Sequence, residues 1–251
     1  MTRIIMSGCS GHMGRVISEL VMQDENAEVV AGIDLVVPED SKYPVYPSFS
    51  EVKEDADVLI DFSTPKILSA LLAEGKKRNM PLVLCTTGYT KEQVAEIEAA
   101  SKELPIVRSA NMSLGVNVLI RLVQEAAKTL AAEGFDIEIV EKHHRLKKDA
   151  PSGTALAIAD AINAALPQAK DYVFDRSTRS EQRPRDEIGI SAVRGGTIVG
   201  DHDVLFCGTD EVITISHTAY SKAIFGKGAV AAAKYLAGQK PGLYTMKDVI
   251  G

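Results

Sequence analysis

The sequence predicts an α/β protein whose first domain is a doubly wound parallel sheet and whose second, α+β domain contains a mixed sheet. Two observations support this fold class. Apolar strand-like segments alternate with helical segments over residues 1–112, and shorter, β-rich segments replace this alternation within residues 113–219. Alternating strands and helices form parallel sheets that carry helices on both faces. The last segment, residues 220–251, could pack back on the first domain.

The first domain opens with a strand within residues 1–7, because Ile4, Ile5 and Met6 form an uninterrupted apolar run. A glycine-rich turn and an amphipathic helix follow, and a second strand ends at Asp34. Strands and helices then alternate through the segments ADVLIDFS, PKILSALLAEGKKRN, PLVLCTTG, KEQVAEIEAASKE and PIVRSANMS. This order predicts one parallel sheet in which right-handed crossovers join the strands.

The second domain begins with a long amphipathic helix that leads into the strand FDIEIVEKHH. A second helix is predicted from Ser152 to about Leu166, and the polar residues 170–187 read as a loop. The segments EIGISAVRGG, HDVLFCGTD and EVITISHTA are short, rich in β-branched residues and separated by glycine-containing turns. This pattern predicts an antiparallel meander. A last helix and the tail GLYTMKDVIG end the chain.

Composition excludes several function classes. The formal net charge is -6 and the sequence pI is about 5.5, whereas nucleic acid or an anionic membrane needs a broad basic surface. The three cysteines are far apart and lack C-x-x-C spacing, so neither a disulfide framework nor a zinc ribbon is indicated. No stretch approaches the ~18 apolar residues of a membrane span. We therefore expect a cytoplasmic protein with a small-molecule partner, and neither nucleic acid nor membrane.

The glycine-rich turn is a variant of the dinucleotide-binding fingerprint. Gly8, Gly11 and Gly14 have the spacing G-x-x-G-x-x-G, between a predicted strand and a predicted helix. Glycine permits the tight turn and the approach of backbone to a pyrophosphate, which the helix N-terminus then binds. Asp34 follows Gly14 by twenty positions, where a carboxylate can bond the ribose hydroxyls. The combination predicts a Rossmann-type domain that favours NADH and tolerates NADPH.

Two further loops leave the ends of predicted strands, where ligands of open α/β sheets bind. They are CTTGY at residues 85–89 and SANMS at residues 109–113. Thr86, Thr87 and Asn111 are suited to bonding the nicotinamide carboxamide or the ribose. The same residues would be ordinary in any loop, so alone they carry little weight.

A basic cluster stands out against the acidic composition. Residues 142–148 contain four Lys or Arg residues and two histidines, His143 and His144, and the turn PSGT follows at residues 151–154. The SGT segment opens a predicted helix, whose free backbone N–H groups attract an anion. The cluster and the helix terminus together predict a site for a carboxylate or phosphate.

Three other interpretations of the cluster compete with this one. Charge runs are usually solvated surface, and some of these lysines and arginines could be no more than that. The two histidines could form a metal site with His202 or His217, but the chain has no H-E-x-x-H motif and no cysteine beside them. We expect no metal. A nucleic-acid patch is disfavoured because no aromatic residue lies within the run.

With the glycine turn, the segments IDFSTP, TTGYT, SANMSLGVN and EKHHRLKKDAPSGTA carry a resemblance that runs essentially from end to end. The chain resembles the 4-hydroxy-tetrahydrodipicolinate reductases, also called dihydrodipicolinate reductases, of bacterial lysine and diaminopimelate synthesis. The resemblance implies NAD(P)H-dependent reduction of 4-hydroxy-tetrahydrodipicolinate to tetrahydrodipicolinate with loss of water. It also implies a homotetramer built through the second domain, a cyclic dicarboxylate substrate and no metal.

The resemblance also implies roles for individual residues. His143 matches the family's catalytic acid/base and Lys147 its proton donor. The residues that match the substrate-carboxylate contacts are His144, Ser152, Gly153 and Thr154. The residues that match the cofactor contacts are Gly8, Cys9, Ser10, Gly11, His12, Met13, Asp34, Cys85, Thr86, Thr87, Ser109, Ala110, Asn111 and Met112.

The chain departs from the family pattern at three positions. Cys85 replaces a glycine that often precedes TTG, Leu35 stands where some members have an arginine for NADPH, and His12 replaces an Arg or Lys. The departure at Cys85 leaves a backbone contact intact, whereas those at Leu35 and His12 leave the nucleotide preference open. Two alternatives remain: another two-domain NAD(P)-dependent dehydrogenase, such as one resembling aspartate dehydrogenase, and a dinucleotide sensor without catalysis.

Overall fold

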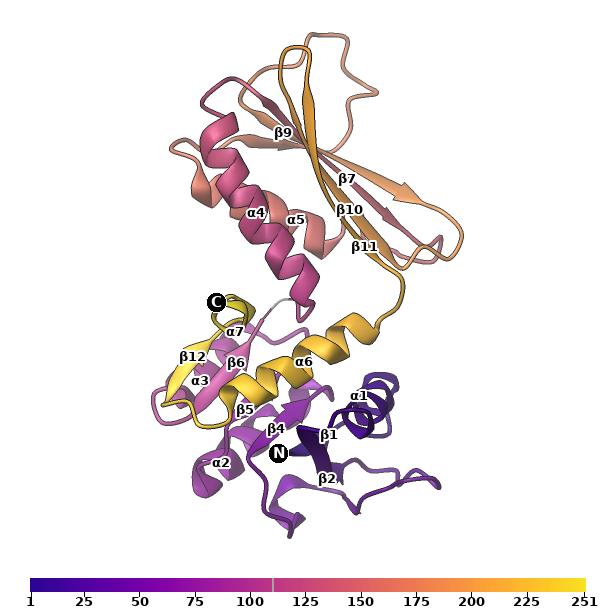
Figure 1. The fold of residues 1–251 in the computed structure, drawn as a ribbon, viewed down its shortest axis with the longest axis vertical. Helices are drawn as coiled ribbons and strands as arrows, with labels where there is room; N and C mark the ends of the chain where they lie inside the picture. Colours follow the sequence, from indigo (N-terminus) through magenta and orange to yellow (C-terminus); the bar gives the residue numbers. More distant parts are fainter. Residues whose placement is uncertain (110) are drawn as a thin grey trace. The chain divides into compact units, whose positions relative to one another are not determined.

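The computed structural model describes residues 1–109 and 111–251 and divides the chain into two compact units (Figure 1). The first unit comprises Met1–Leu114 and Ala223–Gly251, and the second comprises Gly115–Lys222. The C-terminal segment therefore belongs to the same unit as the N-terminus.

The first unit contains a seven-stranded, entirely parallel sheet with the strand order β12-β6-β5-β4-β1-β2-β3. This arrangement confirms the predicted doubly wound sheet. The carboxyl ends of β1, β4 and β5 lie side by side in it, which gathers the loops that follow these strands at one edge. The strands are β1 (Thr2–Ser7), β2 (Ala27–Ile33), β3 (Val45–Tyr46), β4 (Val58–Asp61), β5 (Leu82–Leu84), β6 (Pro105–Arg108) and β12 (Gly242–Tyr244).

Helices cover both faces of this sheet, because side chains alternate between the faces along each strand. Ile4 and Met6 of β1 pack in the layer that includes α1 and α6, whereas Ile5 packs in the layer that includes α2 and α3. The C-terminal helix α6 thus completes the core on one face. The helices are α1 (His12–Met22), α2 (Leu68–Arg78), α3 (Lys91–Ala100), α6 (Ala223–Leu236) and α7 (Met246–Ile250), with short 3₁₀ turns at Phe49–Glu51 and Pro65–Ile67.

The second unit contains a five-stranded mixed sheet with the order β11-β10-β7-β9-β8, and the helices α4 and α5 pack on one face of it (Figure 1). β7 pairs in parallel with β9 and antiparallel with β10, which confirms the predicted mixed sheet. The elements are α4 (Leu114–Leu130), β7 (Asp136–His143), α5 (Gly153–Ala165), β8 (Asp171–Val173), β9 (Glu187–Arg194), β10 (Gly200–Cys207) and β11 (Val212–Ala219).

The predicted meander is wrong in one respect. β10 and β11 form an antiparallel hairpin as expected, but β9 lies on the other side of β7 and does not pair with β10. The reason is the connection: helix α5 crosses over between β7 and the later strands, and such a crossover returns the chain parallel to the strand it left. β7 therefore becomes the central strand of this sheet.

β7 alternates strictly between buried and partly exposed residues. Ile137, Ile139, Glu141 and His143 share the buried face, so the last two buried positions of the strand carry ionisable groups instead of apolar ones. A charged group on a core-facing position requires partners of its own. Glu141 and His143 belong to the candidate active site.

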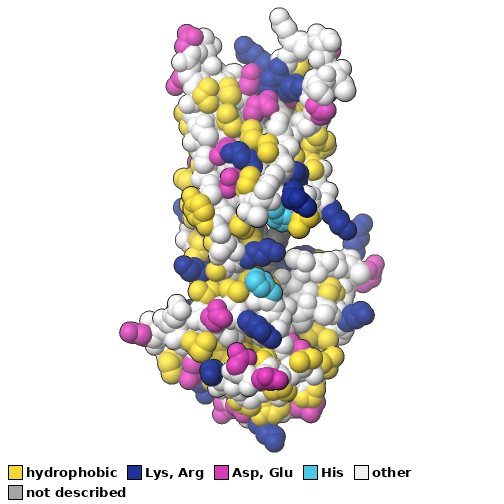
Figure 2. Space-filling model, turned by 90° about the vertical axis from the view of Figure 1, so that its right-hand side faces the viewer, with side chains coloured by type: hydrophobic (Ala, Val, Ile, Leu, Met, Phe, Trp, Pro, Cys, Tyr) yellow, Lys and Arg dark blue, Asp and Glu magenta, His cyan; other side chains and the backbone are white. Residues whose placement is uncertain are grey.

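None of the helices in the described residues, 1–109 and 111–251, is long and apolar enough to cross a membrane. On the face of the molecule in Figure 2, basic side chains are interspersed with acidic and apolar ones.

Candidate active site

The loop between β1 and α1 has the geometry of an anion-binding turn. Gly8 adopts a φ of +79°, a conformation that side chains disfavour, and a Cβ at Gly14 would lie only 2.2 Å from the Gly8 carbonyl oxygen. Gly11 is the N-cap of α1 and provides no side-chain cap. The N–H groups of the first helical turn are therefore left to a ligand, and a phosphate satisfies them best.

Asp34 lies directly after β2 and joins two loops. One carboxylate oxygen accepts a hydrogen bond from the Ser10 N–H at 3.0 Å, and the other accepts one from the Leu35 N–H at 2.8 Å. The Ser10 hydroxyl in turn donates to the Val36 carbonyl. The carboxylate predicted for ribose recognition thus lies beside the glycine turn, and Leu35 is 87% exposed.

Asp61, at the end of β4, is a fully buried carboxyl group that the sequence analysis missed. It accepts hydrogen bonds from the hydroxyls of Ser7 at 2.8 Å, Ser63 at 2.5 Å and Thr86 at 2.6 Å. Burial raises the pKa of Asp61, although these three hydroxyls act to lower it. Asp61 therefore ties the TTGY loop after β5 to the ends of β1 and β4.

The other predicted cofactor residues differ in exposure. Cys9 and Cys85 are buried, and burial raises the pKa of both thiols, so a ligand could meet these residues only through their backbone. His12 and Thr87 are exposed. Gly11 is exposed, whereas Met13 is only partly exposed and Met112 is buried. The predicted residue Ala110 lies outside the described residues.

The loop after β6 is held by its own polar groups. The Ser109 hydroxyl donates to the Asn111 carbonyl at 3.0 Å, and the Asn111 side-chain oxygen accepts from the Ser113 N–H at 2.9 Å. Taken with the glycine turn, where any Cβ at position 14 would collide with backbone, these loops fit a dinucleotide.

His143, at the end of β7, is 8% exposed and lies against a fully buried carboxylate. Its Nδ1 is 2.6 Å from Glu141 Oε2. Arg194 binds both carboxylate oxygens of Glu141 at 2.7 Å each. Burial acts to raise the pKa of Glu141, but the hydrogen bonds from Arg194, His143 and the Ser152 N–H outweigh it and lower the pKa.

The same carboxylate holds the turn that precedes α5. Glu141 Oε1 accepts the Ser152 N–H at 2.9 Å, and the Ser152 hydroxyl caps α5 by accepting the Ala155 N–H at 3.1 Å. The Ser152 hydroxyl also lies 3.0 Å from His202 Nε2. The carboxylate of Glu141 therefore holds two predicted site features in place. It bonds the ring of His143, the candidate catalytic residue, and the backbone at the N-terminus of α5, the predicted anion site.

His202, on β10, packs its ring edge-to-face on His143 with 5.3 Å between the ring centroids. Burial, followed by the nearby His143, lowers the pKa of His202 to about 4. His202 is therefore neutral at physiological pH. Within residues 1–109 and 111–251, no group of three or more His, Cys, Asp or Glu residues is arranged to hold a metal ion.

Lys147 and the SGT turn lie in the loop after β7 and at the start of α5. The ammonium group of Lys147 pairs with Asp149 at 2.9 Å, and the Lys147 N–H donates to the His144 carbonyl at 3.1 Å. Gly153 is exposed, and a Cβ there would meet no atom within 4 Å. Open space therefore lies beside Gly153 at the N-terminus of α5.

Three members of the basic cluster lie apart from the side chains that surround His143. Lys142 lies on the opposite face of β7 from His143, because successive residues of a strand alternate. It pairs with Asp203 at 2.7 Å. Arg145 and Lys148 are exposed, as the solvated-surface interpretation expects.

Sequence reasoning missed Asp61, Glu141 and Arg194. One signal was available for Glu141: it precedes His143 by two residues in a predicted strand, so both share a face, and a carboxylate on a core face needs a cation. Arg194 lies 53 positions further along the chain, and no local pattern connects the two.

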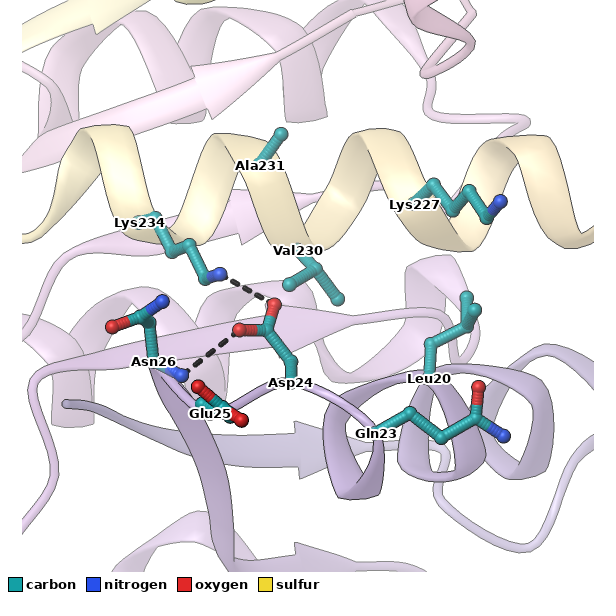
Figure 3. Close-up of a pocket in the computed structure, with 9 residues that line it drawn as sticks. All are labelled: Leu20, Gln23, Asp24, Glu25, Asn26, Lys227, Val230, Ala231 and Lys234. Carbon is teal, nitrogen blue, oxygen red and sulfur yellow. Dashed lines mark hydrogen bonds and ion pairs between the residues drawn. The ribbon is translucent and has the colours of Figure 1, made fainter.

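A cavity of about 510 Å³ lies between α1 and α6 in the first unit (Figure 3). Its wall includes Asp24, whose carboxylate pairs with Lys234 and accepts the Asn26 N–H at 3.0 Å. Asp24 and Asn26 follow the C-terminus of α1, whereas the glycine turn precedes its N-terminus. The cavity is therefore remote from the edge where the loops of the dinucleotide fold converge.

Comparisons with known proteins match this chain to one family. The family profiles described as "Dihydrodipicolinate reductase, N-terminus" and "Dihydrodipicolinate reductase, C-terminus" match residues 2–112 and 115–250. The 4-hydroxy-tetrahydrodipicolinate reductase of Caldanaerobacter subterraneus subsp. tengcongensis is 60% identical over 251 residues, which cover 100% of this chain and 98% of that protein. The protein of the same name from Clostridium novyi is 47% identical, with the same coverage.

Among solved structures, the dipicolinate-bound dihydrodipicolinate reductase from Paenisporosarcina sp. TG-14 matches with a TM-score of 0.84 and 25% identity, and the match covers 100% of both chains. Profiles, relatives and fold therefore agree over the whole length of the sequence. The resemblance inferred from the sequence motifs is confirmed, and the chain belongs to the dihydrodipicolinate reductase family.

Proposed function

We propose that this protein reduces 4-hydroxy-tetrahydrodipicolinate to tetrahydrodipicolinate with NADH or NADPH, releasing water, in diaminopimelate and lysine biosynthesis. Membership of the family supports the reaction. The observation that carries the site assignment is the buried Glu141, which bonds His143 at 2.6 Å and the Ser152 N–H at 2.9 Å. A proton-transfer group and a helix terminus suited to a carboxylate are thereby joined through one residue.

The first unit is the proposed dinucleotide site. The glycine turn would hold the pyrophosphate at the N-terminus of α1, Asp34 the ribose hydroxyls, and Thr86, Thr87 and residues 109–112 the nicotinamide end. The bound nucleotide supplies a hydride. Asp34 favours NADH, because a carboxylate repels the additional phosphate of NADPH.

The second unit is the proposed substrate and proton-transfer site. The exposed N-terminus of α5, with the N–H groups of Gly153 and Thr154, would bind one substrate carboxylate together with the predicted residue His144. His143 and Lys147 would exchange the proton that completes the reduction. Lys147 is paired with Asp149, whose side chain is 60% exposed, so a substrate carboxylate can displace this partner at little cost.

The test of the reaction is oxidation of NADH and of NADPH, with the substrate generated in place from pyruvate and aspartate semialdehyde by the preceding synthase. We expect oxidation only when the synthase is present. NADH binding without oxidation would favour the dinucleotide sensor. Oxidation with another amino or hydroxy acid, and none with the synthase product, would favour a different two-domain dehydrogenase.

The test of Lys147 is the variant Lys147→Ala, with Lys148→Ala as the matched control on an exposed neighbour. General acid catalysis contributes about 10²–10⁴-fold, so we expect a loss of turnover within that range and unchanged NADH binding by calorimetry. The control variant should retain turnover. Unchanged turnover in Lys147→Ala would remove this residue from the mechanism.

We also propose that the protein acts in the cytoplasm as a homotetramer assembled through the second unit. The three cysteines are free, as in a reducing compartment. The sheet face opposite α4 and α5 presents apolar side chains, with Val193 45% and Val212 57% exposed. Light scattering of the purified protein tests the assembly, and a monomeric mass would contradict it.

A further inference from the structure

Glu141 is a fully buried carboxylate with four hydrogen-bond donors around it. Arg194 supplies two of them at 2.7 Å each, the Ser152 N–H one at 2.9 Å, and His143 Nδ1 the fourth at 2.6 Å. A buried carboxylate is stable in its charged form only when it is paired and fully hydrogen-bonded. The bidentate guanidinium meets both conditions, so Glu141 is ionised in the folded protein.

The ionised state of Glu141 determines which ring nitrogen of His143 carries the proton. A carboxylate has only acceptor oxygens, so Nδ1 must donate the hydrogen bond between the two residues. In the neutral imidazole, Nε2 is then the unprotonated nitrogen. Gly200 lies on that side of the ring, where a Cβ would come within 3.0 Å of Nε2. Glycine at this position therefore keeps the neighbourhood of Nε2 open.

The neighbours of the His143 ring include one ion pair and one neutral histidine. Glu141 and Arg194 together carry no net charge, and His202, whose ring packs on His143, is neutral because it is buried. The nearby loop carries Lys147 and Asp149 as an ion pair. On the other strand face, Lys142 is likewise paired with Asp203. A carboxylate oxygen 2.6 Å from Nδ1 is thus the dominant partner of the His143 ring.

We infer that Glu141 is a positioning residue for the reaction. Held in its charged form by Arg194, it fixes His143 as the Nδ1–H tautomer, leaves Nε2 as the atom that exchanges protons, and stabilises the imidazolium formed when His143 takes up a proton. Through the Ser152 N–H it also holds the N-terminus of α5 in register with His143. The inference rests on the proposed function for the reaction, whereas the tautomer is a property of the folded protein.

The variant Glu141→Gln separates this role from simple packing. Glutamine has the same shape but only one acceptor oxygen. Oε1 of Glu141 accepts two fixed donors, from Arg194 and the Ser152 N–H, whereas Oε2 accepts only one from Arg194 and also faces His143. The side-chain oxygen of glutamine should therefore take the Oε1 position and the amide NH₂ the Oε2 position beside His143. That NH₂ donates to Nδ1 and forces the proton of the neutral ring to Nε2. The control is Glu138→Gln, the same change on the opposite face of β7, where Glu138 bonds Arg183.

The experiment is solid-state ¹⁵N NMR of protein labelled at histidine, without substrate or cofactor, with His143→Gln to identify the His143 signals. We expect the Nδ1–H tautomer in the wild type and in Glu138→Gln, and the Nε2–H tautomer in Glu141→Gln. An Nε2–H tautomer in the wild type, or no change in Glu141→Gln, would overturn the inference. Because no turnover is involved, failure of the proposed reaction would not affect this result.

Kinetics provide the second readout. In Glu141→Gln we expect turnover to fall about 100-fold, with the KM for NADH unchanged. We also expect the acidic limb of the pH–rate profile to move to lower pH, because the imidazolium loses its counter-charge. A uniform loss of activity with an unshifted profile would point to a structural role and overturn the inference.

The single variant leaves the half-buried Arg194 without its charged partner, so it could fold poorly. The double variant Glu141→Gln with Arg194→Gln removes this unpaired charge. We expect it to melt closer to the wild type than Glu141→Gln does, while keeping the Nε2–H tautomer and the turnover loss. Recovery of both the wild-type tautomer and the wild-type turnover in the double variant would refute the role of the carboxylate.

Discussion

Asp61 in the first unit and Glu141 in the second are both completely buried carboxyl groups at or near the ends of central strands, yet their pKa values move in opposite directions. Burial raises the pKa of Asp61 because its partners are three neutral hydroxyls. Burial also acts on Glu141, but hydrogen bonds from a guanidinium, an imidazole and an N–H lower its pKa. The charge of the donors, and not the depth of burial, decides the outcome.

The difference suits what each unit is proposed to do. The first unit would bind the phosphates of a dinucleotide, and a carboxyl whose charge is disfavoured repels such an anion less. The second unit would stabilise a protonated imidazole, which requires a carboxylate that stays charged. Asp61 thus organises a loop through Thr86, whereas Glu141 acts on the protonation of its neighbour.

The largest expected effect on the free energy of unfolding comes from removing one of the two carboxylates. Glu141→Ala leaves the half-buried guanidinium of Arg194 without its carboxylate partner, which costs up to about 3–5 kcal/mol of the free energy of unfolding. Asp61→Ala leaves only neutral hydroxyls, which can rotate toward other acceptors, so the loss should be about 1–3 kcal/mol. Urea denaturation of both variants measures the two losses. A larger loss for Asp61→Ala would reverse the ranking on which the comparison depends.

A smaller expected effect is the pH dependence of folding stability, to which the two carboxyl groups contribute with opposite signs. The pKa of Glu141 is lowered, so its stabilisation is present above the ordinary value of 4.5 and is lost as the pH falls through the folded-state pKa. The pKa of Asp61 is raised from 3.8, so the charged group destabilises the fold above its folded-state pKa and this cost disappears as the pH falls.

The neutral variants Glu141→Gln and Asp61→Asn isolate these contributions. As the pH falls from 7 toward about 3, the wild type should lose stability relative to Glu141→Gln and gain it relative to Asp61→Asn, by on the order of 1 kcal/mol per unit of pKa shift. Urea denaturation across this range measures both differences. Changes of the same sign would show that burial alone governs the two groups.

Local patterns in the sequence predicted most of the strands and helices and the glycine turn, because each depends on residues close together in the chain. They missed β8, which lies within the residues 170–187 that were interpreted as a loop. The order of strands in the second sheet was missed, since the meander interpretation ignored the crossover through α5. The site was predicted only in part. His143 and Ser152 lie within a quoted motif, but Arg194 reaches Glu141 across 53 positions and Ser7 reaches Asp61 across 54. Such pairs are set by strand neighbours in a sheet, which local periodicity does not encode.

The smallest expected effect is the loss of stability when a helix-capping side chain is removed, and each unit offers one such cap. Thr90 caps α3 by accepting the Gln93 N–H at 3.2 Å, and Ser152 caps α5 by accepting the Ala155 N–H at 3.1 Å. Loss of either cap costs about 1 kcal/mol, so Thr90→Ala and Ser152→Ala should lower the melting temperature similarly.

Only Ser152→Ala should also lower turnover, because its hydroxyl lies 3.0 Å from His202 Nε2 and its loss leaves that ring without this partner beside His143. Steady-state kinetics of the two variants at equal folded fraction measures the difference. Equal turnover would mean that the Ser152 hydroxyl serves α5 alone. The connection between the helix terminus and His143 would then run solely through the Ser152 N–H and Glu141, which these variants leave intact.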